Sequence, residues 1–222
     1  MNHRKPLKVR QNYLDHLISF KDTEPVKVIT GIRRCGKSSL LLLMQEYLIR
    51  QGIPEEQIIA INFESLTFQE MTYKDLYNYV KNKVTTENTY YLFFDELQKI
   101  DQWELAINSF RVDFNCDIYI TGSNSYLLSS EYSTYLSGRY VEIKMYPLSF
   151  SEFIDFHGYS MTEYKTPLGH VKKRAVNAQQ DIVELSDLFD AYMRYGVMPG
   201  IAYVGLDQDK AFILLVVVYS TV

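Results

Sequence analysis

The segment from Gly31 to Ser38 reads GIRRCGKS and constrains the chain most strongly, because it contains every residue of the pattern G-x-x-x-x-G-K-[ST]. It follows directly on the apolar run Val26–Thr30 and opens a leucine-rich segment, Lys37–Arg50. This is the strand, loop and helix context that a phosphate-binding loop requires. An accidental glycine-rich turn explains the match poorly, so we expect an α/β protein with a nucleotide site.

The residue types of this loop suit phosphate chemistry. Glycines allow a tight fold in which backbone N–H groups face phosphate, and the start of the following helix adds positive potential. Lys37 is expected to reach the β- and γ-phosphates, and Ser38 is expected to be a ligand of Mg²⁺. The residues predicted to bind the nucleotide are Gly31, Ile32, Arg33, Arg34, Cys35, Gly36, Lys37, Ser38 and Ser39.

Two acidic residues follow the apolar run Tyr90–Phe94. Asp95 stands where the carboxyl end of a buried parallel strand would deliver it, and Glu96 comes next. We expect Asp95 to hold the metal through water, whereas Glu96 is placed to polarise an attacking water, which hydrolysis needs. An ordinary acidic turn after a strand is the alternative.

Two further candidates lie beside later strands. Ser123 and Asn124 follow Ile118–Thr121, where a polar side chain could hold the γ-phosphate or the attacking water; a solvated turn is the alternative. Arg139 could contact the γ-phosphate within the chain or in a neighbouring subunit, with a surface arginine as the alternative. The predicted catalytic residues are Lys37, Glu96, Asn124 and Arg139, and the predicted metal ligands are Ser38 and Asp95.

Apolar runs alternate with helical periods over the first 150 residues, which predicts a parallel sheet sandwiched by helices. The expected strands are Val26–Thr30, Ile58–Phe63, Tyr90–Phe94, Ile118–Thr121 and Tyr140–Met145. The expected helices are Lys37–Arg50, Tyr73–Val84 and Trp103–Val112, preceded by an amphipathic helix that includes Val9 and Ile18. Residues 1–150 are therefore predicted to form an α/β P-loop NTPase core.

Beyond residue 150 the pattern changes. The segment SFSEFIDFHGY predicts a short capped helix, and the polar stretch from Ser160 to Gln180, with its basic segment HVKKR, predicts an exposed connection. Helical spacing returns at Leu185, and a final helix is expected from about Asp207. The prediction is a small helical subdomain over residues 151–222, truncated before a further domain because the chain ends in apolar sequence.

Composition excludes several classes of protein. With 23 Lys+Arg against 27 Asp+Glu, the chain lacks the basic excess that drives binding to a phosphate backbone, so any nucleic-acid contact must be local. The basic cluster Arg4, Lys5, Lys8 and Arg10 could make such a contact or could be a solvated terminus. Two cysteines and four histidines lack metal-ligand spacing, and the longest apolar run, Ala211–Tyr219, is too short for a membrane span. We therefore expect a cytoplasmic protein with no membrane contact and no structural zinc.

Five segments, GIRRCGKSSLLL, YYLFFDELQKI, YITGSNSYLLSSE, LSGRYVEIKMYPLSFSEF and YMRYGVMPG, resemble the prokaryotic AAA+ family related to archaeal ATPases. The resemblance runs from about Val9 to the end and implies an ASCE-type P-loop fold with ATP and Mg²⁺ as cofactors. That family carries a C-terminal domain of unknown function after the ATPase core, which agrees with the expected truncation. One departure is Val197, where the family usually has glycine.

The resemblance also implies roles for individual residues. They are Walker A contacts for Lys37 and Ser38, a Walker B pair at Asp95 and Glu96, a sensor position at Asn124 and an arginine finger at Arg139. We expect Mg²⁺-dependent ATP hydrolysis coupled to conformational change or to a DNA or protein partner, with Arg139 as a contact in a homo-oligomer. Physiological role and partner follow from neither the motifs nor the resemblance.

Two other functions remain open at this point. One is a P-loop kinase with HVKKR as a basic lid, and the other is a module that binds nucleotide with negligible turnover. Phosphate release without an acceptor would exclude the kinase. Stabilisation by ATP without phosphate release would favour the module.

Overall fold

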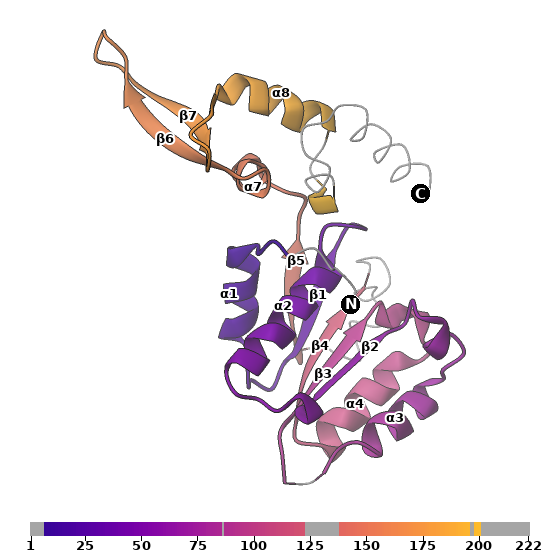
Figure 1. The fold of residues 1–222 in the computed structure, drawn as a ribbon. Coiled ribbons are helices and arrows are strands. Elements are labelled where there is room, and N and C mark those ends of the chain that lie inside the picture. The colour runs from indigo at the N-terminus through magenta and orange to yellow at the C-terminus, as the bar shows by residue number, and fades with distance from the viewer. Residues whose placement is uncertain (1–6, 86, 123–137, 196–197, 201–222) are drawn as a thin grey trace. The chain divides into compact units, whose positions relative to one another are not determined.

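A computed structural model describes residues 7–85, 87–122, 138–195 and 198–200 of the chain. These residues form two units, divided between Met145 and Tyr146 (Figure 1). The predicted sensor residue Asn124 and its neighbour Ser123 lie outside the described residues, as do Val197 and the final helix expected from Asp207.

The first unit is built on a five-stranded parallel sheet, in the order β2-β3-β4-β1-β5. The strands are β1 (Val26–Gly31), β2 (Ile58–Asn62), β3 (Tyr90–Asp95), β4 (Cys116–Thr121) and β5 (Tyr140–Met145). This confirms the predicted α/β fold class, and each predicted strand is present with its ends within two residues of the prediction. One strand, β4, separates β1, which leads into the loop, from β3, which ends in Asp95.

Helices cover both faces of this sheet (Figure 1). The helices are α1 (Gln11–Ser19), α2 (Lys37–Arg50), α3 (Tyr73–Lys81) and α4 (Trp103–Asp113), with short 3₁₀ turns η1 (Glu55–Gln57), η2 (Leu66–Phe68) and η3 (Leu97–Lys99). Apolar side chains from α1 and α2 form a core on one face, and those from α3 and α4 form a larger core on the other. The sheet is therefore the middle layer of three within this unit.

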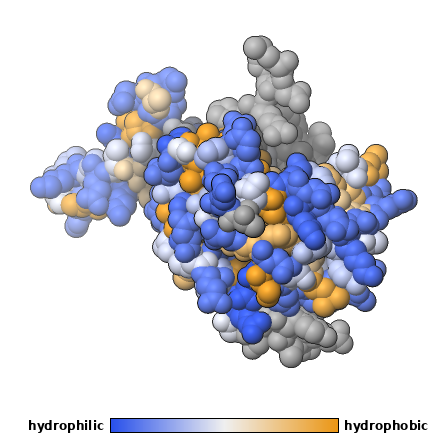
Figure 2. All heavy atoms as spheres, turned by 90° about the horizontal axis from the view of Figure 1, so that it is seen from below, coloured by the Kyte–Doolittle hydropathy of each residue, from blue (hydrophilic) through white to orange (hydrophobic). Residues whose placement is uncertain are grey.

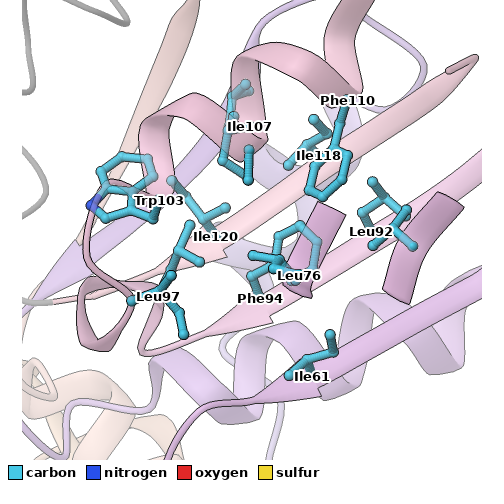
Figure 3. Packing of buried hydrophobic residues seen from close by; sticks show 14 of the residues in the cluster. Ile61, Leu76, Leu92, Phe94, Leu97, Trp103, Ile107, Phe110, Ile118 and Ile120 are labelled. Atoms are coloured by element: carbon cyan, nitrogen blue, oxygen red, sulfur yellow. The ribbon is translucent and has the colours of Figure 1, made fainter. Parts of the chain in front are cut away.

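Side chains of β3 alternate between the two cores, as the two-residue period of a strand requires. Leu92 and Phe94 point into the α3/α4 core (Figure 3). Tyr91 and Phe93 belong to the α1/α2 core on the other face. Every residue of β3 is buried, so the strand reads as a continuous apolar run until Asp95. The alternation places Asp95 on the α2 side of the sheet.

A buried ion pair joins β1 to β4 near the amino-terminal edge of the sheet. The ammonium of Lys27, which is fully buried, pairs with Asp117 and donates to the carbonyl of Thr23 at 2.7 Å. The other carboxylate oxygen of Asp117 accepts from the backbone N–H of Asp22 and from the hydroxyl of Tyr119, each at 2.8 Å. Burial and the charge of Asp117 raise the pKa of Tyr119. The Asp117 carboxylate thus takes its counter-ion and two hydrogen bonds from other groups of the same unit.

In its described residues, the second unit contains two α-helices and a three-stranded antiparallel sheet in the order β6-β7-β8. Its elements are α7 (Phe150–Phe156), β6 (Tyr159–Lys165), β7 (Val171–Asn177), β8 (Ile182–Val183) and α8 (Leu185–Tyr195). A capping box between Ser149 and Glu152 starts α7, as the sequence predicted. The second unit has a small hydrophobic core formed by Ile154 of α7, Ala175 of β7 and Leu188 of α8.

The expected connection from Ser160 to Gln180 is wrong, because this stretch forms β6 and β7. The described part of residues 151–222 is therefore not wholly helical, because it contains this antiparallel sheet as well as α7 and α8, and residues 171–174 of HVKKR form the start of β7. The physical reason is exposure: of these two strands only Ala175 is buried, so neither shows the apolar alternation that identifies a half-buried strand.

Figure 2 shows one face of the molecule, which is largely hydrophilic. Within the ranges that the structure describes, no helix is both long and apolar enough to cross a membrane.

Replacing Lys27 by Met is expected to lower the free energy of unfolding by about 3–5 kcal/mol, because it leaves the Asp117 carboxylate buried without its cation. Urea denaturation would measure the change. The control is Lys74→Met on the exposed surface of α3, which should stay within about 0.5 kcal/mol of the unchanged protein. Equal losses in the two variants would contradict a structural role for the ion pair.

Candidate functional site

The loop between β1 and α2 is shaped by glycines at both of its ends. Gly31 has φ +143° and Gly36 has φ +103°, in the region where side chains are strained. A Cβ at Gly31 would lie 2.3 Å from the carbonyl oxygen of Met145 and 2.9 Å from the Sγ of Cys35. Glycine is therefore required at Gly31 by the close approach of the end of β5 as well as by φ.

Lys37 lies folded back over this loop. Its side chain is buried, and its Nζ donates to the carbonyl oxygens of Gly31 at 3.2 Å and Ile32 at 3.3 Å. The same Nζ lies 3.9 Å from Oε1 of Glu96. The ammonium is thus held between the loop backbone and the end of β3, and α2 directs its first N–H groups, which have no intrahelical acceptors, to the same place.

Three polar side chains form a row at the carboxyl ends of neighbouring strands. Asn62 of β2 pairs with Asp95 of β3 in the sheet register, and Thr121 of β4 follows in step on the other side. Asp95 accepts hydrogen bonds from Asn62 Nδ2 at 3.0 Å and from the Thr121 hydroxyl. Ser38, in the first turn of α2, donates to the same carboxylate at 3.0 Å. The acid row Asn62, Asp95 and Thr121 therefore meets the phosphate-binding loop at Ser38.

The Asp95 carboxyl is set up to favour a nearby cation. Burial raises its pKa, the hydrogen bonds from Thr121 and Ser38 oppose that shift, and the charges of Glu96 and Glu64 add to it. The net shift is upward, so the ionised form is disfavoured while no cation is near. A hydroxyl and a carboxylate are oxygen ligands of the kind that Mg²⁺ prefers, so Ser38 and Asp95 fit the predicted metal.

Glu96 has a strained backbone that directs its side chain toward Lys37. Its φ is +58°, in the left-handed region, and its N–H donates to the Thr121 hydroxyl at 3.0 Å. Its Oε2 accepts from Gln98 Nε2 at 2.5 Å, while Oε1 faces Lys37. A left-handed residue other than glycine costs about 1–2 kcal/mol, and such strain concentrates at functional sites.

A hollow of about 330 Å³ opens beside the acid row. It lies between α2 and β2, and its polar end is formed by Ser38, Asn62 and Asp95. The rest of its wall is mainly apolar, formed by Leu41, Leu42, Gln45, Ala60, Ile61 and Phe93. The Asp95 carboxyl therefore borders open space at one side instead of packed core.

The structure brings some predicted residues together and separates others. Lys37, Ser38, Asp95 and Glu96 converge at the carboxyl edge of the sheet. Of the other predicted loop residues, Ile32, Arg33 and Arg34 are exposed, Ser39 is half-buried, and the Cys35 side chain is buried in the α1/α2 core. Burial also raises the pKa of the Cys35 thiol.

Arg139 lies at the amino-terminal ends of the strands, whereas Lys37 and Asp95 lie at their carboxyl ends. It directly precedes β5, its carbonyl accepts from the N–H of Val26, and β5 runs parallel to β1 from Tyr140 opposite Val26 to Met145 opposite Gly31. Five residue steps at about 3.3 Å each separate this edge from the loop by roughly 17 Å. The exposed Arg139 side chain is therefore remote from Lys37 in its own chain.

Sequence reasoning missed three residues of the site. Asn62 and Thr121 had no assigned role, although each is a polar residue that ends an apolar strand, which is the signal that also marks Asp95. Arg10 was grouped with a basic terminus, yet it is buried and its Nη1 donates to the carbonyl oxygen of Cys35 in the loop at 3.2 Å. No pattern in the sequence distinguishes Arg10 from its basic neighbours.

Comparison with known proteins identifies related sequences. The AAA_14 profile, described as an AAA domain, matches residues 23–154. An uncharacterized protein of Haemophilus influenzae is 43% identical over 194 residues, which cover 86% of this chain and 44% of that protein. An uncharacterized protein of Methanocaldococcus jannaschii is 32% identical over 189 residues, covering 85% of this chain and 39% of that protein. The chain thus spans less than half the length of these two relatives.

Two solved structures align with this chain at low sequence identity. A DNA polymerase III gamma subunit-related protein of Thermotoga maritima aligns with a TM-score of 0.49 at 14% identity, over 65% of this chain and 49% of that one. Cdc6p of Pyrobaculum aerophilum aligns with a TM-score of 0.47 at 13% identity, over 68% of this chain and 49% of that one.

Replacing Gly31 by Ala is expected to destabilise the protein, because the new methyl group would collide with the backbone carbonyl of Met145. The matched control is Gly52→Ala, which has φ +87° but no atom within 4 Å of the added Cβ, so it incurs only the conformational strain. Urea denaturation should show that Gly31→Ala loses about 1–3 kcal/mol more than Gly52→Ala. Equal losses would show that the loop does not press against the end of β5.

Proposed function

The chain belongs to the AAA domain family, and on that premise we propose that it binds ATP with Mg²⁺ at the loop between β1 and α2 and hydrolyses it. The observation that carries the proposal is the convergence of a buried ammonium, Lys37, with two strand-end carboxylates, Asp95 and Glu96. These groups meet at the carboxyl edge of a parallel sheet, which is where ligands bind in open α/β folds.

Binding is proposed to rest on the backbone of residues 31–39 and on Lys37. The α2 N-terminus and the loop amides would face the phosphates, and Lys37 would exchange the loop carbonyls for the β- and γ-phosphate oxygens. Ser38 and Asp95 would hold Mg²⁺, with Asn62 and Thr121 fixing the carboxylate in place. When bound, Mg²⁺ neutralises charge that develops on the phosphate oxygens.

Hydrolysis is proposed to use Glu96 as the general base. Water attacks the γ-phosphorus, its proton passes to the Glu96 carboxylate, and the bond from phosphorus to the β–γ bridging oxygen breaks to release ADP. Gln98 and the left-handed backbone at Glu96 hold the carboxylate beside Lys37. Its Oε2 accepts from the uncharged amide of Gln98, and its Oε1 faces the ammonium of Lys37. Net transfer to water instead of an acceptor makes the reaction an ATPase.

Arg139 is proposed to act in a neighbouring subunit. Its place at the amino-terminal edge of the sheet removes it from the loop of its own chain, and its exposed side chain is available to another copy. An arginine supplied to a partner's γ-phosphate stabilises the charge of the transition state and makes turnover depend on association. We therefore propose a homo-oligomer as the active form.

Nucleotide state is proposed to reach the second unit through β5. The Met145 carbonyl contacts Gly31 so closely that no side chain fits between them, and the second unit begins at the next residue. A change in the conformation of the loop on phosphate release would therefore act on β5, the strand that is followed directly by the second unit. This connection would couple hydrolysis to conformational change and to a DNA or protein partner.

Replacing Glu96 by Gln is expected to slow ATP hydrolysis at least about 100-fold, because the amide cannot take the proton, while ATP still binds. Phosphate release and binding of a fluorescent ATP analogue would be measured in parallel, with Lys37→Ala as the blank. Retention of more than a tenth of the rate would remove Glu96 from the role of base.

Mixing two inactive variants tests whether Arg139 acts between subunits. Lys37→Ala lacks a working loop but keeps Arg139, and Arg139→Ala has the reverse defect, so mixed oligomers contain intact sites and phosphate release should recover. The matched control mixes Lys37→Ala with Glu96→Gln, whose defects lie in the same site and should give no recovery. If Arg139→Ala alone keeps full activity, or if neither mixture recovers, Arg139 is not an intersubunit catalytic residue.

A further inference from the structure

In the described part of the second unit, most basic residues lie on the strands β6 and β7, and most acidic residues lie on the helices α7 and α8. The strands β6 and β7 carry the bases Lys165, Lys172, Lys173 and Arg174 and the acid Glu163. The helices α7 and α8 carry the acids Glu152, Asp155, Asp187 and Asp190 and the base Arg194. The chain as a whole has a formal net charge of −4, but the hairpin formed by β6 and β7 is basic and the two helices are acidic.

The strand register divides this hairpin into two faces, because directly paired residues point to the same side. The inner face comprises Tyr159, Met161, Glu163, Lys165, Val171, Lys173, Ala175 and Asn177. It packs through Ala175 against Ile154 and Leu188, and its Lys173 lies 3.7 Å from Glu163. Part of the positive charge on the inner face is thus already balanced.

The outer face comprises Ser160, Thr162, Tyr164, Lys172, Arg174 and Val176 and has no carboxylate. Cζ of Arg174 lies 5.1 Å from the centre of the Tyr164 ring, so the guanidinium is supported on this face. Ser160, Thr162 and Lys172 are exposed. Five of the six residues are of the types that donate hydrogen bonds to nucleic-acid phosphates, namely Arg, Lys, Ser, Thr and Tyr.

The tip of the hairpin is a closed turn with an apolar end. Thr166 and His170 are joined by two hydrogen bonds, from the N–H of Thr166 to the carbonyl of His170 at 2.8 Å and from the N–H of His170 to the Thr166 hydroxyl at 3.1 Å. Leu168 at the tip is 84% exposed. The hairpin extends beyond α7 and α8, so its tip is free of the helices that support its base (Figure 1).

We propose that the outer face and tip of the β6–β7 hairpin bind double-stranded DNA through its phosphate backbone. Lys172 and Arg174 would neutralise phosphates, the hydroxyls of β6 would donate hydrogen bonds to them, and Leu168 would enter the groove between them. The proposal deepens the proposed function, since it assigns the partner class left open there and the surface that meets it.

The shape of the two-stranded β6–β7 hairpin favours duplex DNA over other polyanions as its partner. A two-stranded ribbon fits the major groove of B-form DNA, whereas the major groove of A-form RNA is too narrow for side chains to enter. Pro167 and Leu168, which lie in the sequence between Lys165 and Lys172, are apolar residues that would contact the thymine methyl groups exposed in the major groove.

The test compares two adjacent lysines that differ in face but not in chemistry. Binding of a fluorescein-labelled duplex of about 20 base pairs is measured by anisotropy without nucleotide, between about 50 and 200 mM salt. We expect Lys172→Gln to weaken binding about 3–10-fold and to reduce the salt slope by about 1, whereas Lys173→Gln, whose charge is balanced by Glu163, stays within about twofold. Lys172→Gln with Arg174→Gln should reduce the slope by about 2.

Several results would overturn the proposal. They are equal losses for Lys172→Gln and Lys173→Gln, no binding by the unchanged chain at the lowest salt, and displacement of the duplex by RNA or polyglutamate at equal charge as readily as by unlabelled duplex. If the double variant does not fold, Lys172→Gln alone decides, because its side chain is exposed. Repeating the series on Lys37→Ala separates this outcome from that of the ATPase proposal, since DNA binding should persist there without phosphate release.

Discussion

The hydrogen bonds to the Asp95 carboxylate are the interaction on which the rest of the site depends. They come from three places far apart in the chain, the first turn of α2 at Ser38, the end of β2 at Asn62 and the end of β4 at Thr121. All three donors meet at Asp95 only if the strands keep their register and α2 lies on the face that Asp95 points to. The sheet order, the alternation of β3 and the position of the loop are therefore constrained together by one buried acid.

Much of the first unit could be predicted from the sequence because its central strands β1, β3 and β4 are buried on both faces. Such strands are short apolar runs, and their order along the chain with intervening helices determines a parallel sheet. Asn62 was not predicted as part of the site because a polar residue at the end of a strand does not by itself indicate its partner, and that partner, Asp95, is 33 residues away. The β6–β7 hairpin was missed for the opposite reason, since a ribbon exposed on most of both faces leaves hardly any apolar alternation to detect.

Charge is arranged differently in the two units, and this difference bears on how they work. In the first unit, Lys27 and Asp117 pair with each other at one edge of the sheet, and Lys37 donates to carbonyl oxygens of the loop at the other edge. In the described part of the second unit, four bases lie on the exposed ribbon of β6 and β7, whose outer face lacks acids. The first arrangement suits a rigid site for one small anionic ligand, and the second suits a long polyanion held by several weak contacts.

The most direct test of the metal and nucleotide site is calorimetric titration of a non-hydrolysable ATP analogue, with and without Mg²⁺, into the unchanged chain and into Asp95→Ala. We expect Mg²⁺ to tighten binding at least about tenfold, equivalent to about 1.4 kcal/mol, in the unchanged chain. That gain should vanish in Asp95→Ala, while the weaker binding without metal, which rests on the loop and Lys37, survives. An equal effect of Mg²⁺ on both proteins would show that the metal does not sit at the acid row.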